Sequence, residues 1–340
     1  MTDIVLNQLS KTWGTTAVVD RISFSVKAGS FAVLLGPSGC GKSTTLRMLA
    51  GLDLPSGGSI AIGGRDVTHA TPAQRNLSMV FQSYALFPHL DVRNNILFGL
   101  KVRKEPAADY DKRLNRVVDM LSLGGLLERK PGQLSGGQQQ RVSLARAIIA
   151  ETPVCLMDEP LSNLDAKLRQ EMRRDIRDLQ RKLGVTMVYV THDQTEAMSM
   201  ADQVILMRAG RIEQDGTPEE LYSRPATTFA ATFIGTPPTN IFPANDGLII
   251  GVRPEHIRIV ESGGVQGSVV GNEYLGADTL VTCEVPAQGG EAPWRIVAKL
   301  PGRQEPAQGI SMRLGWDAQY EHRFDSTSGA RIRCAESSSK

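Results

Sequence analysis

One loop constrains this chain more than any other stretch of its sequence. Residues 36–44 read GPSGCGKST; they follow the apolar run FAVLL, Phe31–Leu35, and lead into the helical pattern TTLRMLAG. Glycines let backbone N–H groups converge on an anion, and the amino end of a helix adds partial positive charge. The sequence therefore predicts a P-loop, a phosphate-binding loop between a buried strand and a helix.

The whole loop is predicted to bind ATP. Lys42 can reach the β- and γ-phosphates, where it would also act in catalysis, and the Ser43 hydroxyl can offer an oxygen to Mg²⁺. A thiol at a helix amino end, such as that of Cys40, can have a lowered pKa. We favour the interpretation that Cys40 is a small residue that fits the turn. The predicted ATP-binding residues of the loop are Gly36, Pro37, Ser38, Gly39, Cys40, Gly41, Lys42, Ser43 and Thr44.

A pair of carboxylates ends another apolar run. Val154–Glu159 reads VCLMDE, and successive side chains of a strand point in different directions. Asp158 can hold Mg²⁺ through water, while Glu159 can accept a proton from the water that attacks the γ-phosphate. Adjacent carboxylates at strand ends are often only solvated turns. The pair indicates a nucleotide site because the same chain also contains the predicted phosphate-binding loop.

A second helix start also suits an anion. Residues 134–140 read LSGGQQQ and precede the helical run RVSLARAIIA, so Ser135 would place a hydroxyl there and the glycines bare backbone amides. A chain that already has a phosphate loop needs this second terminus chiefly for nucleotide bound by a neighbouring copy. The arrangement therefore predicts a shared, symmetric site.

The order of elements predicts the fold class of the first two thirds of the chain. Up to about Ile234, apolar strand-like runs alternate with longer helical patterns, which is typical of α/β proteins with a largely parallel sheet. Chemistry in such folds lies at the carboxyl ends of the strands. The runs that matter most are Phe31–Leu35, Val154–Met157 and Met187–Val190. A helix between Asp165 and Gly184 is predicted from apolar residues on one face, namely Leu168, Met172, Ile176, Leu179 and Leu183.

The pattern changes after Ile234. The stretch GTPPTN breaks regular structure, and short strand-like runs separated by glycine-rich turns follow it. These runs predict a small β-barrel or sandwich. The predicted strands are Leu248–Val252, Thr279–Val285, Arg295–Leu300 and Ser311–Leu314, with turns at Gly263-Gly264 and Gly289-Gly290.

Composition limits the classes of partner. The 38 Lys and Arg nearly balance the 36 Asp and Glu, so nucleic acid is not expected as a partner. Neither a secretory signal nor an apolar run of about 18 residues is present, so any membrane role is expected to be peripheral. The cysteines lie far apart with no C-x-x-C pair, which favours a reducing cytosol over a disulfide framework or a metal knuckle. They are Cys40, Cys155, Cys283 and Cys334.

The combination of GPSGCGKST, LSGGQ and VCLMDEP resembles the ABC transporter ATPases. The resemblance implies an α/β fold, a P-loop ABC-type nucleotide-binding domain with a helical subdomain, followed by a small C-terminal all-β, OB-like domain. The implied domains are an ATPase at 1–235, with its helical subdomain at about 83–153, and a β-barrel-like regulatory domain at 236–340. Residues 243–250 alone separate IF from GVRPEHI, where the family carries a longer strand-rich segment, so the second domain is expected to be shortened.

The same resemblance implies further site residues. Gln82, in MVFQSYALFPHL, matches the Q-loop that touches Mg²⁺ and the attacking water and senses the membrane subunits. His192, in YVTHDQ, matches the switch histidine that grips the γ-phosphate. Trp13, in SKTWG, stands where the family stacks an aromatic ring, usually tyrosine, on adenine. Gln139 replaces a common arginine, with a modest expected effect on docking of the helical subdomain. Residues implied to contact nucleotide held by the partner copy are Ser135, Gly136, Gly137, Gln138 and Asp165.

Longer stretches are similar to one branch of the family. EPLSNLDAKLR, THDQTEAM, and GTPPTN followed by GVRPEHI resemble bacterial importers for sugars, maltooligosaccharides and glycerol 3-phosphate, and YLGAD at 274–278 leans towards the last. The implied function is an ATP-hydrolysing subunit that uses Mg²⁺ and energises import of a sugar, polyol or glycerol-3-phosphate-like solute.

The implied assembly is a homodimer with two transmembrane permease subunits and an extracytoplasmic solute-binding protein. It would lie at the cytoplasmic face of the bacterial inner membrane. A soluble ABC-type ATPase outside transport is the alternative, because it shares the same nucleotide chemistry. The single cassette and the nearly neutral charge weigh against that alternative.

Overall fold

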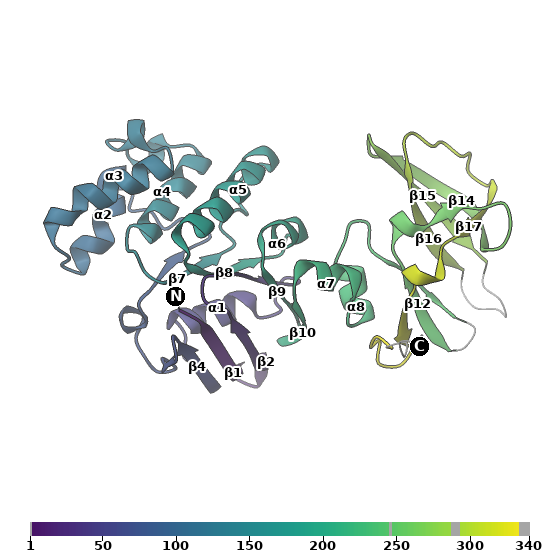
Figure 1. The fold of residues 1–340 in the computed structure, drawn as a ribbon, viewed down its shortest axis with the longest axis horizontal. Helices are drawn as coiled ribbons and strands as arrows, with labels where there is room; N and C mark the ends of the chain where they lie inside the picture. Colours follow the sequence, from purple (N-terminus) through teal and green to yellow (C-terminus); the bar gives the residue numbers. More distant parts are fainter. Residues whose placement is uncertain (1, 245–246, 287–292, 333–340) are drawn as a thin grey trace, which may run out of the picture. The chain divides into compact units, whose positions relative to one another are not determined.

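The computed structural model describes residues 2–244, 247–286 and 293–332. The chain divides into two compact units, Met1–Pro218 and Glu219–Lys340 (Figure 1). The boundary expected from the sequence, between residues 235 and 236, lies later in the chain and stays a prediction.

The first unit is built on a six-stranded sheet with the order β10-β9-β3-β8-β7-β6. Five of its strands are parallel, and β10 pairs antiparallel with β9. Every residue of β3 and β8 is buried, as expected for parallel strands covered on both faces. The three runs predicted as strands are confirmed as β3, β7 and β8. The strands are β3 (Phe31–Leu35), β6 (Leu77–Val80), β7 (Val154–Asp158), β8 (Thr186–Thr191), β9 (Gln203–Arg208) and β10 (Arg211–Gly216).

A second, antiparallel sheet in this unit has the order β2-β1-β4-β5. One apolar core joins the two sheets: Leu6 of β1 belongs to it, as do Leu34 of β3 and Leu46 of α1. The helix α1 that follows the GPSGCGKST loop is therefore anchored in the main core. The elements are β1 (Ile4–Trp13), β2 (Thr16–Val26), β4 (Gly57–Ile62), β5 (Arg65–Asp66) and α1 (Lys42–Ala50).

The helices α2, α3 and α4 gather at one end of this unit, with α5 beside them (Figure 1). The helix predicted between Asp165 and Gly184 is confirmed as α5: Met172, Ile176 and Leu179 are buried on one face, and Asp165 caps its start. Its other predicted apolar residues, at 168 and 183, are half-buried. The helices are α2 (Val92–Val102), α3 (Tyr110–Met120), α4 (Gly136–Ile148), α5 (Ala166–Leu183) and α6 (Gln194–Met200).

The second unit contains two antiparallel sheets, with the orders β11-β12-β18 and β13-β17-β14-β15-β16. Phe242 stacks on Trp294 at 4.7 Å and meets Trp316 at 5.0 Å, so one apolar core joins the sheets. The four predicted strands are confirmed as β12, β15, β16 and β17. The predicted turn at Gly263-Gly264 lies between β13 and β14. The other predicted turn, at Gly289-Gly290, lies outside the described residues. The elements are α7 (Pro218–Ser223), α8 (Thr228–Phe233), β11 (Asn240–Pro243), β12 (Leu248–Val252), β13 (Arg258–Ile259), β14 (Val265–Tyr274), β15 (Asp278–Val285), β16 (Trp294–Pro301), β17 (Ser311–Gly315) and β18 (His322–Asp325).

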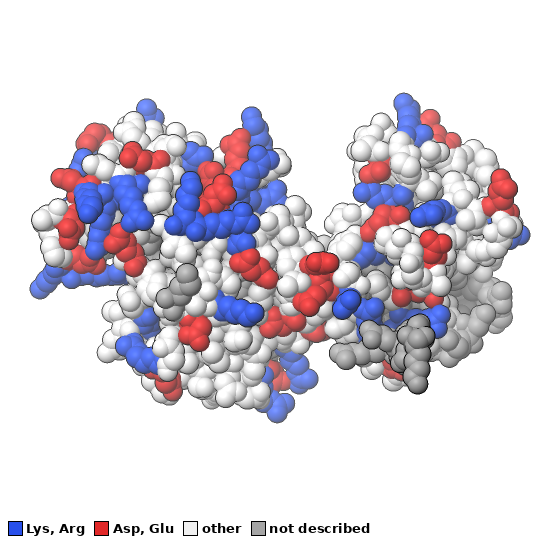
Figure 2. Space-filling view, viewed as in Figure 1, with Lys and Arg blue, Asp and Glu red and all other residues white. Residues whose placement is uncertain are grey.

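Charged side chains of both signs are mixed over the visible face of each unit (Figure 2). Some of them join helices, as where Arg141 of α4 pairs with Asp175 of α5 at 3.1 Å. Within the described ranges, no helix has the length and apolar character needed to cross a bilayer.

Candidate nucleotide-binding site

The register of the parallel sheet brings four sequence-distant segments into one row. Leu35 of β3 pairs with Thr191 of β8, and Asp158 of β7 pairs with Val190 of β8. The residues that follow these strands, at 36, 159 and 192, therefore leave the sheet at the same carboxyl edge. Gln82 leaves the same edge two residues after β6, whose Val80 pairs with Met157. This edge is where parallel sheets place their chemistry.

The loop at 36–44 has a conformation that requires its first and last glycines. Gly36 has φ +154, and a Cβ there would lie 2.3 Å from the Met207 carbonyl oxygen. Gly41 has φ +101, and its Cβ would lie 2.8 Å from the Val18 carbonyl oxygen. Both clashes are with backbone atoms, which cannot rotate away. Glycine at both positions therefore permits the tight loop conformation that an anion cradle needs.

The Lys42 ammonium lies inside this loop. Its Nζ donates to the carbonyl oxygens of Gly36 at 2.8 Å and Pro37 at 2.9 Å, and the residue is buried. The Cys40 thiol is also buried, and burial raises its pKa, with nearby Lys42 opposing that rise. This direction is opposite to the lowered pKa that a helix amino end alone can give. Burial outweighs it, which agrees with the view of Cys40 as a small residue that fits the turn.

Ser43 and Asp158 meet across 115 residues of sequence. Ser43 Oγ donates to Asp158 Oδ1 at 2.9 Å. Burial raises the pKa of the Asp158 carboxyl, and the hydrogen bond from Ser43 opposes this effect. A hydroxyl and a carboxylate oxygen at this distance are hard donors of the kind that Mg²⁺ prefers. The donor set therefore fits Mg²⁺, with water and phosphate oxygens to complete the coordination.

Glu159 and His192 face each other at the same edge. Glu159 Oε2 lies 3.3 Å from His192 Nδ1, with 20% of the Glu159 side chain and 56% of the His192 side chain exposed. The Glu159 backbone has φ +40 and donates its N–H to the Val190 carbonyl at 3.0 Å. That hydrogen bond fixes the backbone of a left-handed residue directly after β7, and the contact with His192 orients its carboxylate.

Two residues that the sequence reasoning did not single out organise this edge. Gln82 Nε2 donates to Ser162 Oγ at 3.3 Å, and Ser162 Oγ donates to the Glu159 carbonyl at 3.0 Å. Asn163 Nδ2 donates to the Gln82 carbonyl at 3.2 Å. Ser162 and Asn163 both lie in LSNLD, in which the sequence predicts a site role for Asp165 alone. Their polar side chains next to VCLMDEP were the available signal, but the partner segment around Gln82 is about 80 residues away.

Trp13 ends β1 with 55% of its surface exposed. The Lys11 ammonium lies 4.3 Å from the centroid of its ring, a cation–π distance. Lys11 precedes Trp13 by two residues, so the two side chains share one face of the strand. An open indole face and a nearby cation suit a flat aromatic group that carries phosphates.

The LSGGQ residues form a second group, built on the starts of α4 and α5. Ser135 Oγ accepts from the Gln138 backbone N–H at 3.4 Å, and Gln138 Oε1 accepts from the Ser135 N–H at 3.0 Å, a capping box. A Cβ on Gly137 would lie 2.6 Å from Leu168 Cδ2, so glycine permits close packing on α5. Asp165 caps α5 by accepting from the Leu168 N–H at 2.9 Å.

Gly136 and Gln139 lie next to these residues in the first turn of α4. A Cβ on Gly136 would lie 3.5 Å from Leu164 Cδ2, an ordinary contact distance. Gln139 Nε2 donates to the carbonyl oxygens of Pro131 at 3.0 Å and Leu134 at 3.4 Å. The residue that departs from the common LSGGQ context therefore binds the turn before α4.

Comparison with family models matches both parts of the chain. Residues 19–162 match the ABC transporter model, and residues 250–324 match the TOBE domain model. The curated relatives include the sn-glycerol-3-phosphate import ATP-binding protein UgpC of Ruegeria sp. (strain TM1040), 44% identical over 98% of this chain and 99% of that protein. The UgpC protein of Brucella abortus (strain 2308) is 51% identical over 77% of this chain and 80% of its own length.

Solved structures with the same fold cover the first unit. A dimeric ATP-binding cassette in a post-hydrolysis state, bound to ADP and Pi, is 29% identical with a TM-score of 0.57, over 63% of this chain and 98% of that one. The cbiO1 protein of Clostridium perfringens, part of the ABC transporter complex cbiONQ, is 26% identical with a TM-score of 0.61, over 65% and 90% of the two chains.

Proposed function

The chain belongs to the ATP-binding subunits of ABC transporters, and from this premise we propose that its two halves of a nucleotide site meet between two copies of the chain. It is an ATPase that energises an importer. The observation that carries the site assignment is the single carboxyl edge that holds the P-loop, the Ser43–Asp158 contact and the Glu159–His192 pair.

In this proposal the P-loop holds the phosphates of ATP. Its backbone amides and the amino end of α1 bind phosphate oxygens, and phosphate replaces the Gly36 and Pro37 carbonyls as the acceptor for Lys42. Trp13 stacks on the adenine ring. The indole face lies on the antiparallel sheet, whereas Lys42 lies at the start of α1, so the two ends of the nucleotide are held by different layers.

Ser43, Asp158 and Gln82 are the residues proposed to hold Mg²⁺. When bound, Mg²⁺ neutralises charge on the β- and γ-phosphates. Asp158 is suited to this task because its partly buried carboxyl already accepts a hydrogen bond from Ser43. Gln82 donates to Ser162 at the same edge, so a movement of the Q-loop that carries Gln82 would reach the proposed Mg²⁺ site.

Glu159 is the proposed general base. It takes a proton from water as the water oxygen attacks the γ-phosphorus, and the bond to the β-phosphate oxygen breaks to give ADP and phosphate. His192 lies 3.3 Å from Glu159, so it can orient the carboxylate and donate towards a γ-phosphate oxygen. Lys42 stabilises the charge that develops on the leaving oxygens.

The partner copy is proposed to supply Ser135, Gly137 and Asp165. These residues lie at the starts of α4 and α5, whereas the P-loop and the two carboxylates lie at the carboxyl ends of β3 and β7. The capping box uses the Ser135 hydroxyl as an acceptor, which leaves its O–H free to donate to a phosphate oxygen. Two copies related by a two-fold axis then complete two equal sites.

The Glu159→Gln variant tests the general base. Glutamine keeps the shape of the side chain but cannot accept the proton, so ATP turnover should fall by about 10²–10⁴-fold. ATP should then trap a dimer that elutes ahead of the monomer in size-exclusion chromatography. Glu171→Gln, on the exposed face of α5, is the matched control and should behave like wild type. A Glu159→Gln protein that still hydrolyses ATP briskly would remove Glu159 from this role.

The shared site is tested separately. If Ser135 acts on nucleotide held by the other copy, the specific rate of ATP hydrolysis should rise with protein concentration and fall in Ser135→Ala. A rate that is independent of concentration, together with an unimpaired Ser135→Ala variant, contradicts the shared site.

The solute is proposed to be a sugar, a polyol or a glycerol-3-phosphate-like compound. Support comes from the relatives named for glycerol-3-phosphate import over nearly the full length of this chain. The proposed assembly has two copies of this chain on the cytoplasmic face of the bacterial inner membrane, below two permease subunits that receive solute from a binding protein outside.

An exposed apolar group next to the Q-loop suits contact with the permeases. Phe98 of α2 is 37% exposed and lies 4.3 Å from the Phe87 ring, between centroids, and Val102 is 64% exposed on the same helix. Phe87 follows Gln82 by five residues, so this surface and the site edge share one segment.

Purification from detergent-solubilised membranes tests the transport assignment. Two hydrophobic subunits should co-purify with the chain, and solute with its binding protein should stimulate ATP hydrolysis by the complex. Recovery of the chain from the soluble fraction alone, active on ATP without membrane subunits, favours the soluble ABC-type ATPase instead.

A further inference from the structure

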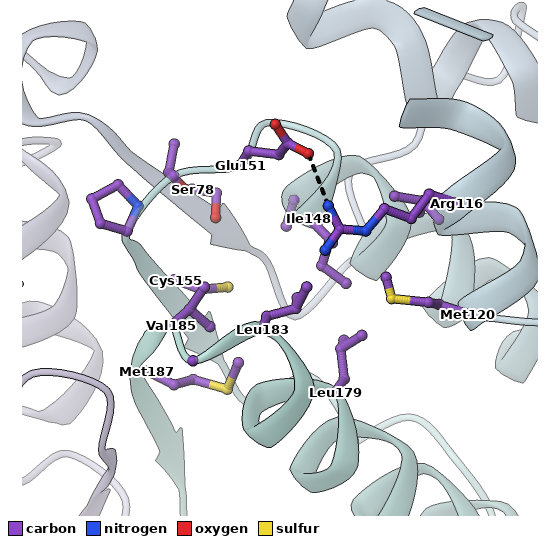
Figure 3. Close-up of a pocket in the computed structure, with 15 residues that line it drawn as sticks. Ser78, Arg116, Met120, Ile148, Glu151, Cys155, Leu179, Leu183, Val185 and Met187 are labelled. Carbon is purple, nitrogen blue, oxygen red and sulfur yellow. Dashed lines mark hydrogen bonds and ion pairs between the residues drawn. The ribbon is translucent and has the colours of Figure 1, made fainter. Parts of the chain in front are cut away.

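A cavity of about 500 Å³ lies in the first unit (Figure 3). It lies at the amino ends of β7 and β8, whereas the nucleotide edge is formed by their carboxyl ends. Cys155 and Met187, each the second residue of its strand, form part of its wall, whereas residues 158 and 191 end the same strands at the nucleotide edge. The helices α3, α4 and α5 supply the rest, through Met120, Ile148 and Leu183 among others. The volume is in the range of small-molecule sites.

The wall of this cavity is mainly apolar and polarisable. Aliphatic side chains of Ile148, Leu183 and Val185 and the thioethers of Met120 and Met187 line it (Figure 3). Thioether side chains adapt their shape to a flat or irregular apolar guest. Burial raises the pKa of the Cys155 thiol to about 11, so this thiol is not a nucleophile at neutral pH. A ligand would therefore bind reversibly rather than by a bond to sulfur.

The charges at the cavity are already paired. Arg116 Nη1 lies 3.3 Å from Glu151 Oε1, the ion pair drawn in Figure 3, and Arg113 lies 3.4 Å from the other oxygen of Glu151. Arg113 also pairs with Glu105 at 2.7 Å. Two arginines and two glutamates leave no net charge for an ionic ligand to balance. An ionic group would have to break one of these pairs and lose its own hydration.

We propose that this cavity is a binding site for an uncharged, largely apolar small molecule, with the Ser78 hydroxyl as a polar anchor. Its position between the ends of α4 and α5 separates it from every residue assigned to ATP. Binding at this site does not depend on the proposed ATPase mechanism, so the two proposals fail or succeed separately.

The probe for this site is N-phenyl-1-naphthylamine, an uncharged aromatic whose fluorescence rises in apolar surroundings. Titrated into the full-length protein, it should give a saturable rise with one site per chain. Val185→Trp places a large ring in the cavity and should weaken the affinity at least tenfold. Val270→Trp makes the same exchange at a position on β14 of the second unit that is 37% exposed, and should leave the affinity unchanged.

A second filling variant and a charged probe keep the proposal testable. Leu183→Trp fills the cavity from α5 and replaces Val185→Trp if thermal unfolding shows that the latter does not fold. The sulfonated analogue 1-anilinonaphthalene-8-sulfonate should bind at least tenfold more weakly than the neutral probe. No saturable binding, unchanged affinity in a folded filling variant, or tighter binding of the sulfonate would each overturn the proposal.

Discussion

Replacing Arg75 by methionine should loosen the helix that carries the phosphate loop. The Arg75 guanidinium is almost fully buried and donates to four carbonyl oxygens. Two of them belong to Met48 and Leu49 in the last turn of α1, at 2.7 and 2.9 Å, and the others to Thr68 at 3.1 Å and Ala70 at 3.0 Å. Arg75 therefore ties the end of α1 to the segment after β5.

The size of the effect follows from these contacts. Hydrogen bonds from a charged donor contribute about 1.5–3 kcal/mol each, so four of them set an upper range of about 6–12 kcal/mol. These values are already net of desolvation, and four hydrogen bonds from one side chain are not additive, so this sum is an upper limit. Removing one partner of a buried charged interaction typically costs about 3–5 kcal/mol, and we expect a loss of that size here. For a unit of this size each kcal/mol lowers the melting temperature by about 2–4 °C, giving about 6–20 °C.

Calorimetry and hydrogen exchange of the α1 amides provide the assay. In Arg75→Met, we expect an earlier transition and faster exchange at Lys42–Ala50. Arg47→Met is the matched control, because Arg47 is 48% exposed and makes one surface ion pair with Asp53, worth about 0–1 kcal/mol. A melting temperature within about 2 °C of wild type, with α1 protected as before, would refute the reasoning.

Three further results are expected. Burial lowers the pKa of His322 to about 4, so below about pH 6.5 the unfolded chain binds a proton that the folded chain does not. The free energy of unfolding of the second unit should therefore fall by up to about 3 kcal/mol between about pH 6.5 and pH 4. Urea unfolding of His322→Phe should not show this fall. Trp13→Ala should raise KM for ATP about 2–10-fold in steady-state assays, and Trp13→Tyr should restore it. Gly137→Ala pushes against Leu168, so turnover should fall about tenfold, and recover in the double variant with Leu168→Ala.

The sequence by itself determined the features that lie within one continuous segment. GPSGCGKST between a strand and a helix predicted the P-loop because the glycines, the lysine and the helix start are contiguous. The apolar spacing between Asp165 and Gly184 predicted α5 because a helix repeats locally. The resemblance of the motifs likewise identified the family, which the comparisons confirm.

Tertiary structure decided what depends on residues far apart in the chain. The contact between Ser43 and Asp158, and the link from Gln82 through Ser162 to Glu159, follow from the register of β6, β7 and β8, which no local pattern encodes. Burial decided the direction of the Cys40 pKa, because the helix end acts locally but desolvation depends on the whole core. The cavity beside Cys155 also arises from packing between separate helices and the sheet, and so it could not be read from sequence.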